Sequence, residues 1–302
     1  MKPVRVPAAG AILLCLQPVG LTPLAARTHR HAASAVRPAI WVLRDKDTSI
    51  YLFGTIHALP PHFDWETPAL RRVIARSDRL VLEAVIDDPA RSAQVLLKLG
   101  KADKPVPPLA ERVAPKFRKA LAAMEAKAGV PAATLDTMKT WAAAMVLFGV
   151  TVSDLGVSSA DGVEDALKKQ FRAQGKPVEG LETLEQQLGF FDTLTEAQQR
   201  AFLESVVDQR PDDAADFGTM LTAWSHGDEA GIAESFDRDM KSADALREVL
   251  LAKRNARWAD LLIKRLAKPG VEMVAVGAGH LVGPDSVRAR LKALGYKTVR
   301  VE

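Results

Sequence analysis

Two histidines stand in matching sequence contexts near opposite ends of the chain. His57 follows an apolar run and Gly54 in YLFGTIHALPP, and His280 follows a second apolar run and Gly277 in MVAVGAGHLVGP. A neutral imidazole is a common ligand of catalytic metals, and a glycine three residues earlier permits a sharp turn or a close backbone approach. The repeated Gly-x-x-His pattern predicts that both histidines bind one metal ion. The alternative is that each is a hydrogen-bonded residue that closes a turn.

Glu83 is the carboxylate that best completes such a site, because it ends the apolar run in RLVLEAVI. A buried carboxylate is costly unless it is paired, hydrogen-bonded or bound to a metal. We expect Glu83 to bind the metal or to act as a general base, and the alternative is an ion pair with an arginine such as Arg254. Glu182 follows a short apolar segment in the same way, and it serves equally well as a cap of the next helix.

The segment RNARW adds polar groups within about one helical turn. The guanidinium of Arg254 suits a substrate carboxylate or a developing oxyanion, with Asn255 beside it, and the alternative is a structural salt bridge. In SADGVEDAL, Asp161 is a helix N-cap candidate and Glu164 its capping-box partner. The chain lacks an HExxH motif, a phosphate-binding glycine loop and a convincing Ser-His-Asp set.

These residues belong to two similar units of strand, helix and strand at the two ends of the chain. The first unit comprises a hairpin over 39–45 and 48–56, a helix over 67–77 and a strand over 79–86, and the second a strand over 271–281, a helix over 286–295 and a strand over 296–302. In both units the histidine lies where a strand ends, which is where open α/β sheets place their ligand crevices.

The middle of the chain, about 88–253, has a mostly helical pattern. The expected helices span 89–99, 111–128, 132–148, 162–174, 184–194, 196–208, 212–225 and 228–240, with a short buried strand over 176–182. The fold class that follows is α/β (α+β): a central mixed sheet built from both chain ends plus the middle strand, with a large helical insertion.

The first residues have the layout of a secretory signal peptide, with Lys2 and Arg5 before a short apolar run and small residues at the exit. We expect a signal peptide over 1–26, cleaved after Ala26 or as late as Ala35, and one domain over 37–302 in a periplasmic or secreted protein. An uncleaved anchor is the alternative. No later segment of the sequence is apolar for long enough to span a bilayer.

Charge and cysteine content bear on the partners and on the chemistry that the chain could have. Loss of Lys2 and Arg5 with the leader reduces the net charge from +4 to +2, so the charge gives no argument for nucleic acid binding. The sequence also lacks a clustered basic stripe with interleaved aromatic residues. The single cysteine, Cys15, lies in the leader, which excludes disulfides, thiolate nucleophiles and cysteine metal ligands from the exported protein.

Several motifs together resemble the TraB/PrgY/GumN family, specifically its bacterial GumN-like exported branch. They are WVLRDKDTSIYLFGTIHALP, SDRLVLEAV, GKPVEGLETLEQQ, WSHGD, KRNARWADLL and VAVGAGHLVGPDSV, and the resemblance covers 39–302. It implies a fold like that of erythromycin esterase-like proteins and a relation to the Tiki metalloproteases. It also implies an active site made of both Gly-x-x-His motifs and Glu83, with support from Glu182, Arg254 and Asn255.

The function expected from these features is that of an exported hydrolase that depends on a divalent metal, manganese, cobalt or zinc, and acts on a peptide or small polar substrate. It would be peripheral to the envelope, with no transmembrane helix in the mature chain and no nucleic acid partner. The alternatives are a non-catalytic periplasmic protein that binds a peptide or glycan, and a structural partner of an export or polysaccharide apparatus.

Overall fold

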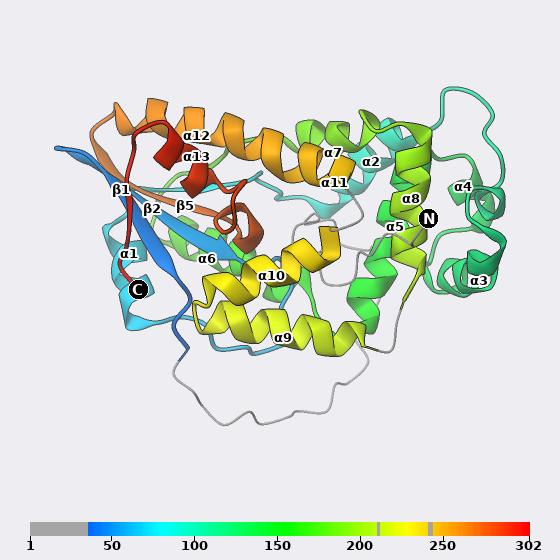
Figure 1. Cartoon of the computed structure of the whole chain (residues 1–302), viewed down its shortest axis with the longest axis horizontal. Coiled ribbons are helices and arrows are strands. Elements are labelled where there is room, and N and C mark those ends of the chain that lie inside the picture. Colours follow the sequence, from blue (N-terminus) through cyan, green and yellow to red (C-terminus); the bar gives the residue numbers. More distant parts are fainter. Residues whose placement is uncertain (1–35, 210–211, 241–243) are drawn as a thin grey trace.

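A six-stranded mixed sheet lies at one end of the molecule and a group of helices at the other (Figure 1). The computed structural model describes residues 36–209, 212–240 and 244–302, so the expected signal peptide and its cleavage sites lie outside the described residues. The strand order is β4-β3-β5-β2-β1-β6. The strands are β1 (Ile40–Arg44), β2 (Thr48–Thr55), β3 (Arg79–Leu82), β4 (Val178–Gly180), β5 (Gly270–Gly277) and β6 (Thr298–Arg300).

Both chain ends contribute to the centre of the sheet, as the sequence predicts. β1 and β2 form the expected antiparallel hairpin, and the Asp45 carboxylate shapes its turn by accepting from the backbone N–H of Thr48 at 2.8 Å. β2 then pairs in parallel with β5, so the two Gly-x-x-His strands are direct neighbours, and β3 pairs with β5 on the other side. β2, β5 and β3 therefore end at the same edge of the sheet.

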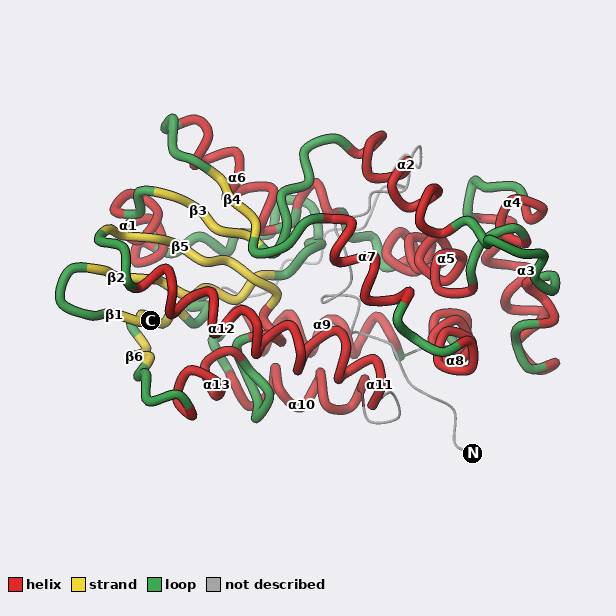
Figure 2. The backbone as a smooth tube through the Cα atoms, turned by 90° about the horizontal axis from the view of Figure 1, so that it is seen from above, coloured by secondary structure: helices red, strands yellow, loops and turns green. Residues whose placement is uncertain are grey.

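Helices cover both faces of the sheet (Figure 2). The core on one face joins α1 (Pro68–Arg76) and α6 (Val163–Ala173) to the sheet, and the core on the other joins α12 (Lys253–Leu266) and α13 (Val287–Ala293). Successive side chains of a strand point to opposite faces, so a strand covered on both sides must be apolar at nearly every position. This explains why the sequences of β2, β3 and β5 read as continuous apolar runs.

Local sequence signals set the bounds of the flanking helices. Thr67 caps α1 by accepting from the backbone N–H of Leu70 at 3.0 Å, and Pro68 follows at a position where no N–H is needed. Gly295 ends α13 with a φ of 88°, a conformation that favours glycine. Both helices fall within the ranges expected from the sequence.

The described part of the middle of the chain is mostly helical and includes the strand β4, as expected. Besides α6, its helices are α2 (Pro89–Gly100), α3 (Arg118–Lys127), α4 (Ala132–Asp136), α5 (Thr140–Asp154), α7 (Leu184–Asp192), α8 (Glu196–Val207), α9 (Asp213–Ser225), α10 (Glu229–Met240), α11 (Asp244–Arg247) and the π-helical turn η5 (Glu248–Ala252). α11, η5 and α12 follow one another without a break, so the helical region continues into the segment that carries RNARW.

Two of the expected helices are interrupted, and the middle strand is shorter than expected. The helix expected over 111–128 breaks at Pro115, which starts the short 3-10 turn η3 (Pro115–Phe117). The helix expected over 132–148 breaks before Thr140, because Lys139 has extended backbone angles. β4 lies at the edge of the sheet and is partly exposed, so the prediction of a buried strand over 176–182 is wrong in length and burial.

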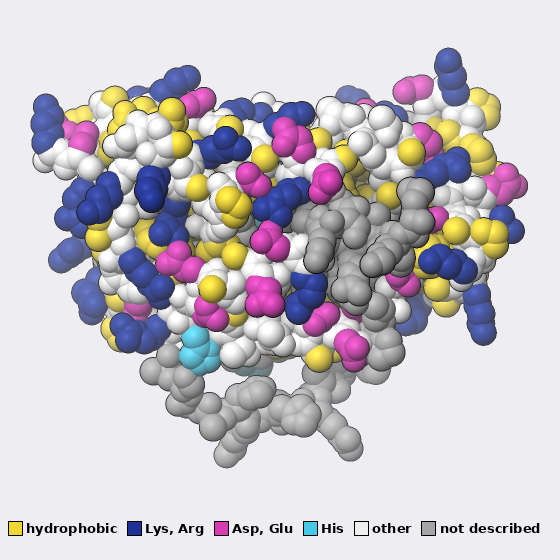
Figure 3. Space-filling view, viewed as in Figure 1, with side chains coloured by type: hydrophobic (Ala, Val, Ile, Leu, Met, Phe, Trp, Pro, Cys, Tyr) yellow, Lys and Arg dark blue, Asp and Glu magenta, His cyan; other side chains and the backbone are white. Residues whose placement is uncertain are grey.

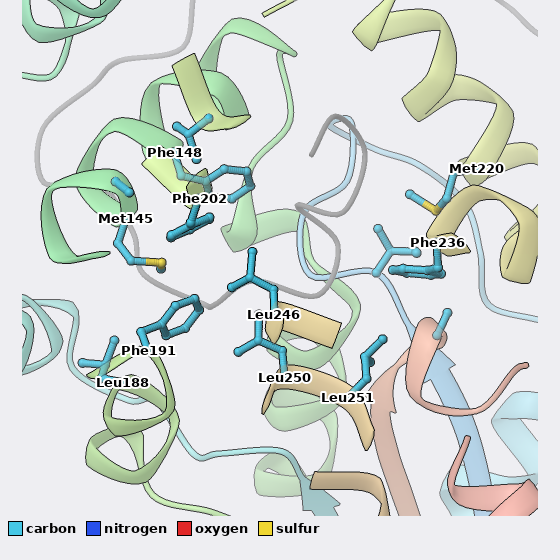
Figure 4. Close-up of a cluster of buried hydrophobic side chains, with 14 of the residues drawn as sticks. Met145, Phe148, Leu188, Phe191, Phe202, Met220, Phe236, Leu246, Leu250 and Leu251 are labelled. Carbon is cyan, nitrogen blue, oxygen red and sulfur yellow. The ribbon is translucent and has the colours of Figure 1, made fainter. Parts of the chain in front are cut away.

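The larger of the two apolar clusters connects the helices of the middle of the chain to one face of the sheet. Figure 4 shows side chains of α5, α7 and α8 packed toward Leu246, Leu250 and Leu251, with Phe236 of α10 on the sheet side.

Outside this core, acidic and basic side chains are intermixed on the face seen in Figure 3. Among the described residues, no helix has the length and apolar character required to cross a membrane.

Candidate active site

The three residues predicted to share a metal converge at the carboxyl ends of β2, β3 and β5. Oε1 of Glu83 lies 3.8 Å from Nε2 of His57 and 3.6 Å from Nε2 of His280. The exposed fractions are 6% for Glu83, 6% for His57 and 0% for His280, so the cluster is almost dry. Parallel pairing places the strand ends side by side, which is how residues far apart in sequence meet here.

His280 is fixed in one tautomer by Asn255 of α12. The Asn255 side-chain nitrogen donates to the carbonyl oxygen of Asp285 at 2.8 Å, so its oxygen faces Nδ1 of His280 at 2.6 Å. Nδ1 therefore carries the hydrogen, and the lone pair is on Nε2. Burial lowers the pKa of His280 to about 3, because the attraction of Glu83 only partly offsets burial and the repulsion from Arg254. This imidazole stays neutral.

His57 is held by a residue that the sequence did not reveal as part of the site. Its Nδ1 lies 2.6 Å from Oε1 of Glu164, in the first turn of α6, and the Thr55 hydroxyl donates to the same oxygen. The prediction that Glu164 completes a capping box with Asp161 is wrong: the N-cap of α6 is Gly162, and the Glu164 side chain is buried against the histidine.

A signal for this contact lies in Gly162. A Cβ at this position would overlap the carbonyl oxygen of His57, so the start of α6 and the histidine backbone are in direct contact. Glu164 stands two positions after this glycine and was therefore a candidate for the site. Only the contact itself, which joins distant parts of the chain, distinguishes it from an ordinary helix cap.

Glu83 is a buried carboxylate that accepts three hydrogen bonds. Its Oε1 accepts from the backbone N–H of Gly277 at 2.8 Å, and its Oε2 accepts from Arg254 at 2.7 Å and from Gln187 at 3.4 Å. Burial raises the pKa of Glu83, but the charge of Arg254, with smaller contributions from His280, His57 and the Gly277 hydrogen bond, outweighs it and lowers the pKa to about 2. The arginine ion pair that the sequence left open is thus present, and Oε1 still faces both imidazoles.

Arg254 lies between two buried carboxylates. Its guanidinium donates to Oε2 of Glu182 at 3.0 Å as well as to Glu83, and it reaches the carbonyl oxygen of Leu250 at 3.2 Å. Glu182 also accepts from the indole N–H of Trp258 at 2.9 Å and from Arg257. Arg254 and Glu182 therefore form the salt bridge that the sequence kept as an alternative to direct substrate contact.

The two glycines of the repeated motif have different tasks. Gly54 allows a close approach, because a Cβ there would lie 3.0 Å from the Cα of Ala278, in the turn η6 (Ala278–His280) that carries His280. Its carbonyl oxygen also accepts from the indole N–H of Trp224 at 2.8 Å. Gly277 contributes its backbone N–H to Glu83. The motif thus brings the two histidine-bearing turns together.

A small cavity reaches the site from the side of α6. Its volume is about 170 Å³, and it is lined by His57, Leu82, Ala84, Ile86, Asp87, Pro89, Ser159, Glu164, Asp165 and Lys168. The lining combines apolar side chains with charged ones. Lys168 balances part of the acidic wall, because its amine lies 2.9 Å from Asp165 and donates to the carbonyl oxygen of Ile86. His280 does not line this cavity.

The residue types of this cluster are those of a divalent-metal site, but their arrangement does not form one. Across the described residues, no group of three or more His, Cys, Asp or Glu side chains is arranged so that it could hold a metal ion. Even so, two imidazoles and one carboxylate oxygen face one another with both Nδ1 atoms engaged elsewhere, which is how histidine ligands of zinc are oriented. The separations of 3.6 and 3.8 Å compare with about 3.4 Å between ligands at ~2.1 Å from a tetrahedral zinc.

The sequence of the chain matches the model of a known protein family. Residues 39–300 match the model of the TraB/PrgY/gumN family. The chain belongs to this family. The resemblance read from the sequence motifs is therefore confirmed.

One relative is similar to this chain over most of the length of both proteins. The chain is 22% identical over 267 residues to an uncharacterized protein of Treponema pallidum (strain Nichols), a match that covers 82% of this chain and 78% of the relative. No solved structure matches. The relative carries no stated activity, so the functional argument rests on the geometry of the site.

Proposed function

We propose that this TraB/PrgY/gumN-family chain is an exported, divalent-metal-dependent hydrolase that acts on peptides or small polar substrates. The observation that supports it best is the direction of the two imidazoles. Both Nε2 atoms face one oxygen of Glu83, and both Nδ1 atoms are occupied by other groups. A divalent cation placed among these three atoms would be stabilised by lone pairs and by a carboxylate charge in a buried site. Manganese, cobalt and zinc all accept such a donor set.

A bound divalent ion would lower the pKa of a coordinated water and polarise the scissile carbonyl. His57, His280 and Glu83 would hold the ion. The low pKa of Glu83 makes it a weak proton acceptor, so the structure favours the ligand role over the general-base role for this carboxylate. Arg254 keeps Glu83 ionised and fixes one of its oxygens, which leaves the other for the metal.

The substrate class rests on the dimensions of the cavity and on the expected location. A cavity of about 170 Å³ beside His57 admits a group of side-chain size but not a folded partner. Export through the expected signal peptide would place the enzyme in the periplasm or outside the cell, where peptides are available. A signal peptide cleaved between 26 and 35 would be detected by N-terminal sequencing of the secreted chain.

The experiment that tests the proposal measures metal content and thermal stability of the chain that lacks residues 1–26. We expect about one divalent ion per chain and a rise in melting temperature with manganese, cobalt or zinc. His57→Ala and His280→Ala should both lose the ion and the rise. His226→Ala is the matched control, because His226 is exposed and bonded to its own helix. A wild-type chain with neither bound metal nor a shift would refute the proposal.

A metal-free binding protein is the second candidate function. It is favoured by Arg254, whose guanidinium lies 3.4 Å from Nε2 of His280 and already supplies a positive charge to the cluster. In that case a peptide or glycan would bind the same cavity through hydrogen bonds. Its affinity would survive exhaustive chelation, whereas the affinity of a metal-dependent enzyme for a substrate analogue would not.

A further inference from the structure

The Nδ1 atoms of the two site histidines contact chemically different groups, a carboxylate at His57 and an amide at His280. We propose that Glu164 is the positioning residue for His57: it accepts the hydrogen of Nδ1 and thereby turns the lone pair of Nε2 toward Glu83. The consequence for metal affinity rests on the proposed function. The choice of tautomer does not, because it concerns the chain alone.

The first support is the arrangement of donors around Glu164. Thr55, His57 and Glu164 are all buried, with exposed fractions of 0%, 6% and 7%. In such surroundings a carboxylate oxygen requires donors, and Oε1 of Glu164 faces the Thr55 hydroxyl and Nδ1 of His57 at 2.6 Å. A carboxylate is an acceptor, so the hydrogen of a neutral His57 is on Nδ1.

The second support is the set of backbone contacts that join the start of α6, which carries Glu164, to the segment that carries His57. The chain is hydrogen-bonded across this contact on both sides of the histidine. The backbone N–H of Val163 donates to Ile56 at 3.1 Å, and Leu59 and Ser158 exchange backbone bonds at 3.2 and 3.0 Å. Gly162 packs directly on the His57 carbonyl between these two attachments. The distance between the carboxylate and the imidazole is therefore set by the fold, not by a flexible side chain.

The third support is the position of Glu164 in its helix. It is the second residue of α6 (Val163–Ala173), where the partial positive charge of the helix N-terminus stabilises an anion. Asn255 gives His280 the same tautomer with no charge. A histidine backed by a carboxylate donates more strongly to a metal, so His57 and His280 are not equivalent ligands.

The test compares two variants with one matched control in the full chain. Glu164→Met retains volume but removes the acceptor. Glu164→Gln retains an acceptor oxygen but removes the charge. Asp161→Asn is the control, because it removes one carboxylate that is exposed and lies just before the same helix. Circular dichroism confirms that each variant is folded.

The first readout is the tautomer of the neutral His57 ring in metal-free protein, measured by nitrogen NMR and assigned with His57→Ala. We expect the hydrogen on Nδ1 in the wild type, in Glu164→Gln and in Asp161→Asn, and a shift toward Nε2 in Glu164→Met. A hydrogen on Nε2 in the wild type, or an unchanged Nδ1 tautomer in Glu164→Met, would overturn the proposal.

The second readout is the dissociation constant for zinc ions alone. We expect an increase of about 10- to 100-fold in Glu164→Met, a smaller increase in Glu164→Gln and none in Asp161→Asn. Unchanged affinity in Glu164→Met would refute the positioning role and leave the metal site intact. A wild type that binds no zinc would count against the proposed function, while the NMR result would still decide the role of Glu164.

Discussion

Arg112 and Arg254 are both almost fully buried, yet they are held by different kinds of partner. Arg112, with an exposed fraction of 1%, donates to the carbonyl oxygens of Pro107, Met138 and Asp136 at 2.7, 2.6 and 2.6 Å. Arg254, with 3%, donates to the carboxylates of two glutamates. The first arginine joins loops between helices, and the second lies among the residues of the candidate active site.

The two environments change the acidity of the arginines in opposite directions. Burial lowers the pKa of Arg112, and the more distant carboxylates of Glu196 and Asp136 do not make up for it. Burial also acts on Arg254, but Glu83 and Glu182 outweigh it and raise the pKa. A buried charge that is held mainly by backbone carbonyl groups is a structural element. A buried charge among carboxylates and histidines sets the electrostatics of a site.

The largest effect on stability should follow from Arg254→Met. Removing the guanidinium leaves Glu83 and Glu182 buried with too few positive partners, and breaking a buried pair in this way costs about 3 to 5 kcal/mol. Urea unfolding of metal-free protein would measure it. If the loss were below about 1 kcal/mol, the two carboxylates would not depend on this arginine and the comparison would fail.

Arg112→Met should have a smaller effect on stability and none on the site. Three carbonyl groups, of Pro107, Asp136 and Met138, would lose their donor, and a net loss of about 2 kcal/mol is expected after local rearrangement. Zinc affinity should stay at the wild-type value, measured by titration alongside Arg254→Met. A large fall in zinc affinity would mean that Arg112 is coupled to the site and is not purely structural.

The acid limb of the stability curve should distinguish the site from the rest of the molecule. The unfolded chain binds a proton on His280 below about pH 6.5, but the folded chain does so only near pH 3, so the free energy of unfolding falls as pH decreases through this window. The contribution reaches about 1.4 kcal/mol per pH unit. The corresponding loss from Glu83 begins only near pH 4.5 and continues to about pH 2.

His280→Ala should therefore flatten the curve between pH 6.5 and 4.5 in metal-free protein, while Arg112→Met should leave its slope unchanged. Denaturant unfolding at half-unit pH steps would show the difference. A slope in His280→Ala equal to that of the wild type would mean that another group binds this proton.

The smallest effect is expected from Trp258→Phe. The change removes one donor to Glu182, but Arg254 and Arg257 still reach the same carboxylate. We expect a loss of about 1 kcal/mol, the usual net value of one hydrogen bond, measured by thermal unfolding. A loss comparable to that of Arg254→Met would show that the indole and not the arginine dominates the burial of Glu182.

Local sequence patterns were sufficient for the histidines and Glu83 but not for their supports. The apolar runs before His57, Glu83 and His280 are strands because they must be buried on both faces, and their ends fall at one edge once the strands are parallel. Glu164 gave a stronger local signal as a helix cap than as a partner of His57. Its role depends on a contact between α6 and the end of β2, which no short-range pattern encodes.

By itself, the sequence determined the mixed sheet formed by both chain ends, the helical middle and the two repeated histidine motifs, because periodicity, glycine positions and helix caps act over a few residues. Only the tertiary structure decided that Arg254 is shared by Glu83 and Glu182, that Asn255 fixes His280, and that Glu164 faces His57. The reason is electrostatic. A buried charge is costly without a partner, and the folded chain can supply that partner from any distance along the sequence.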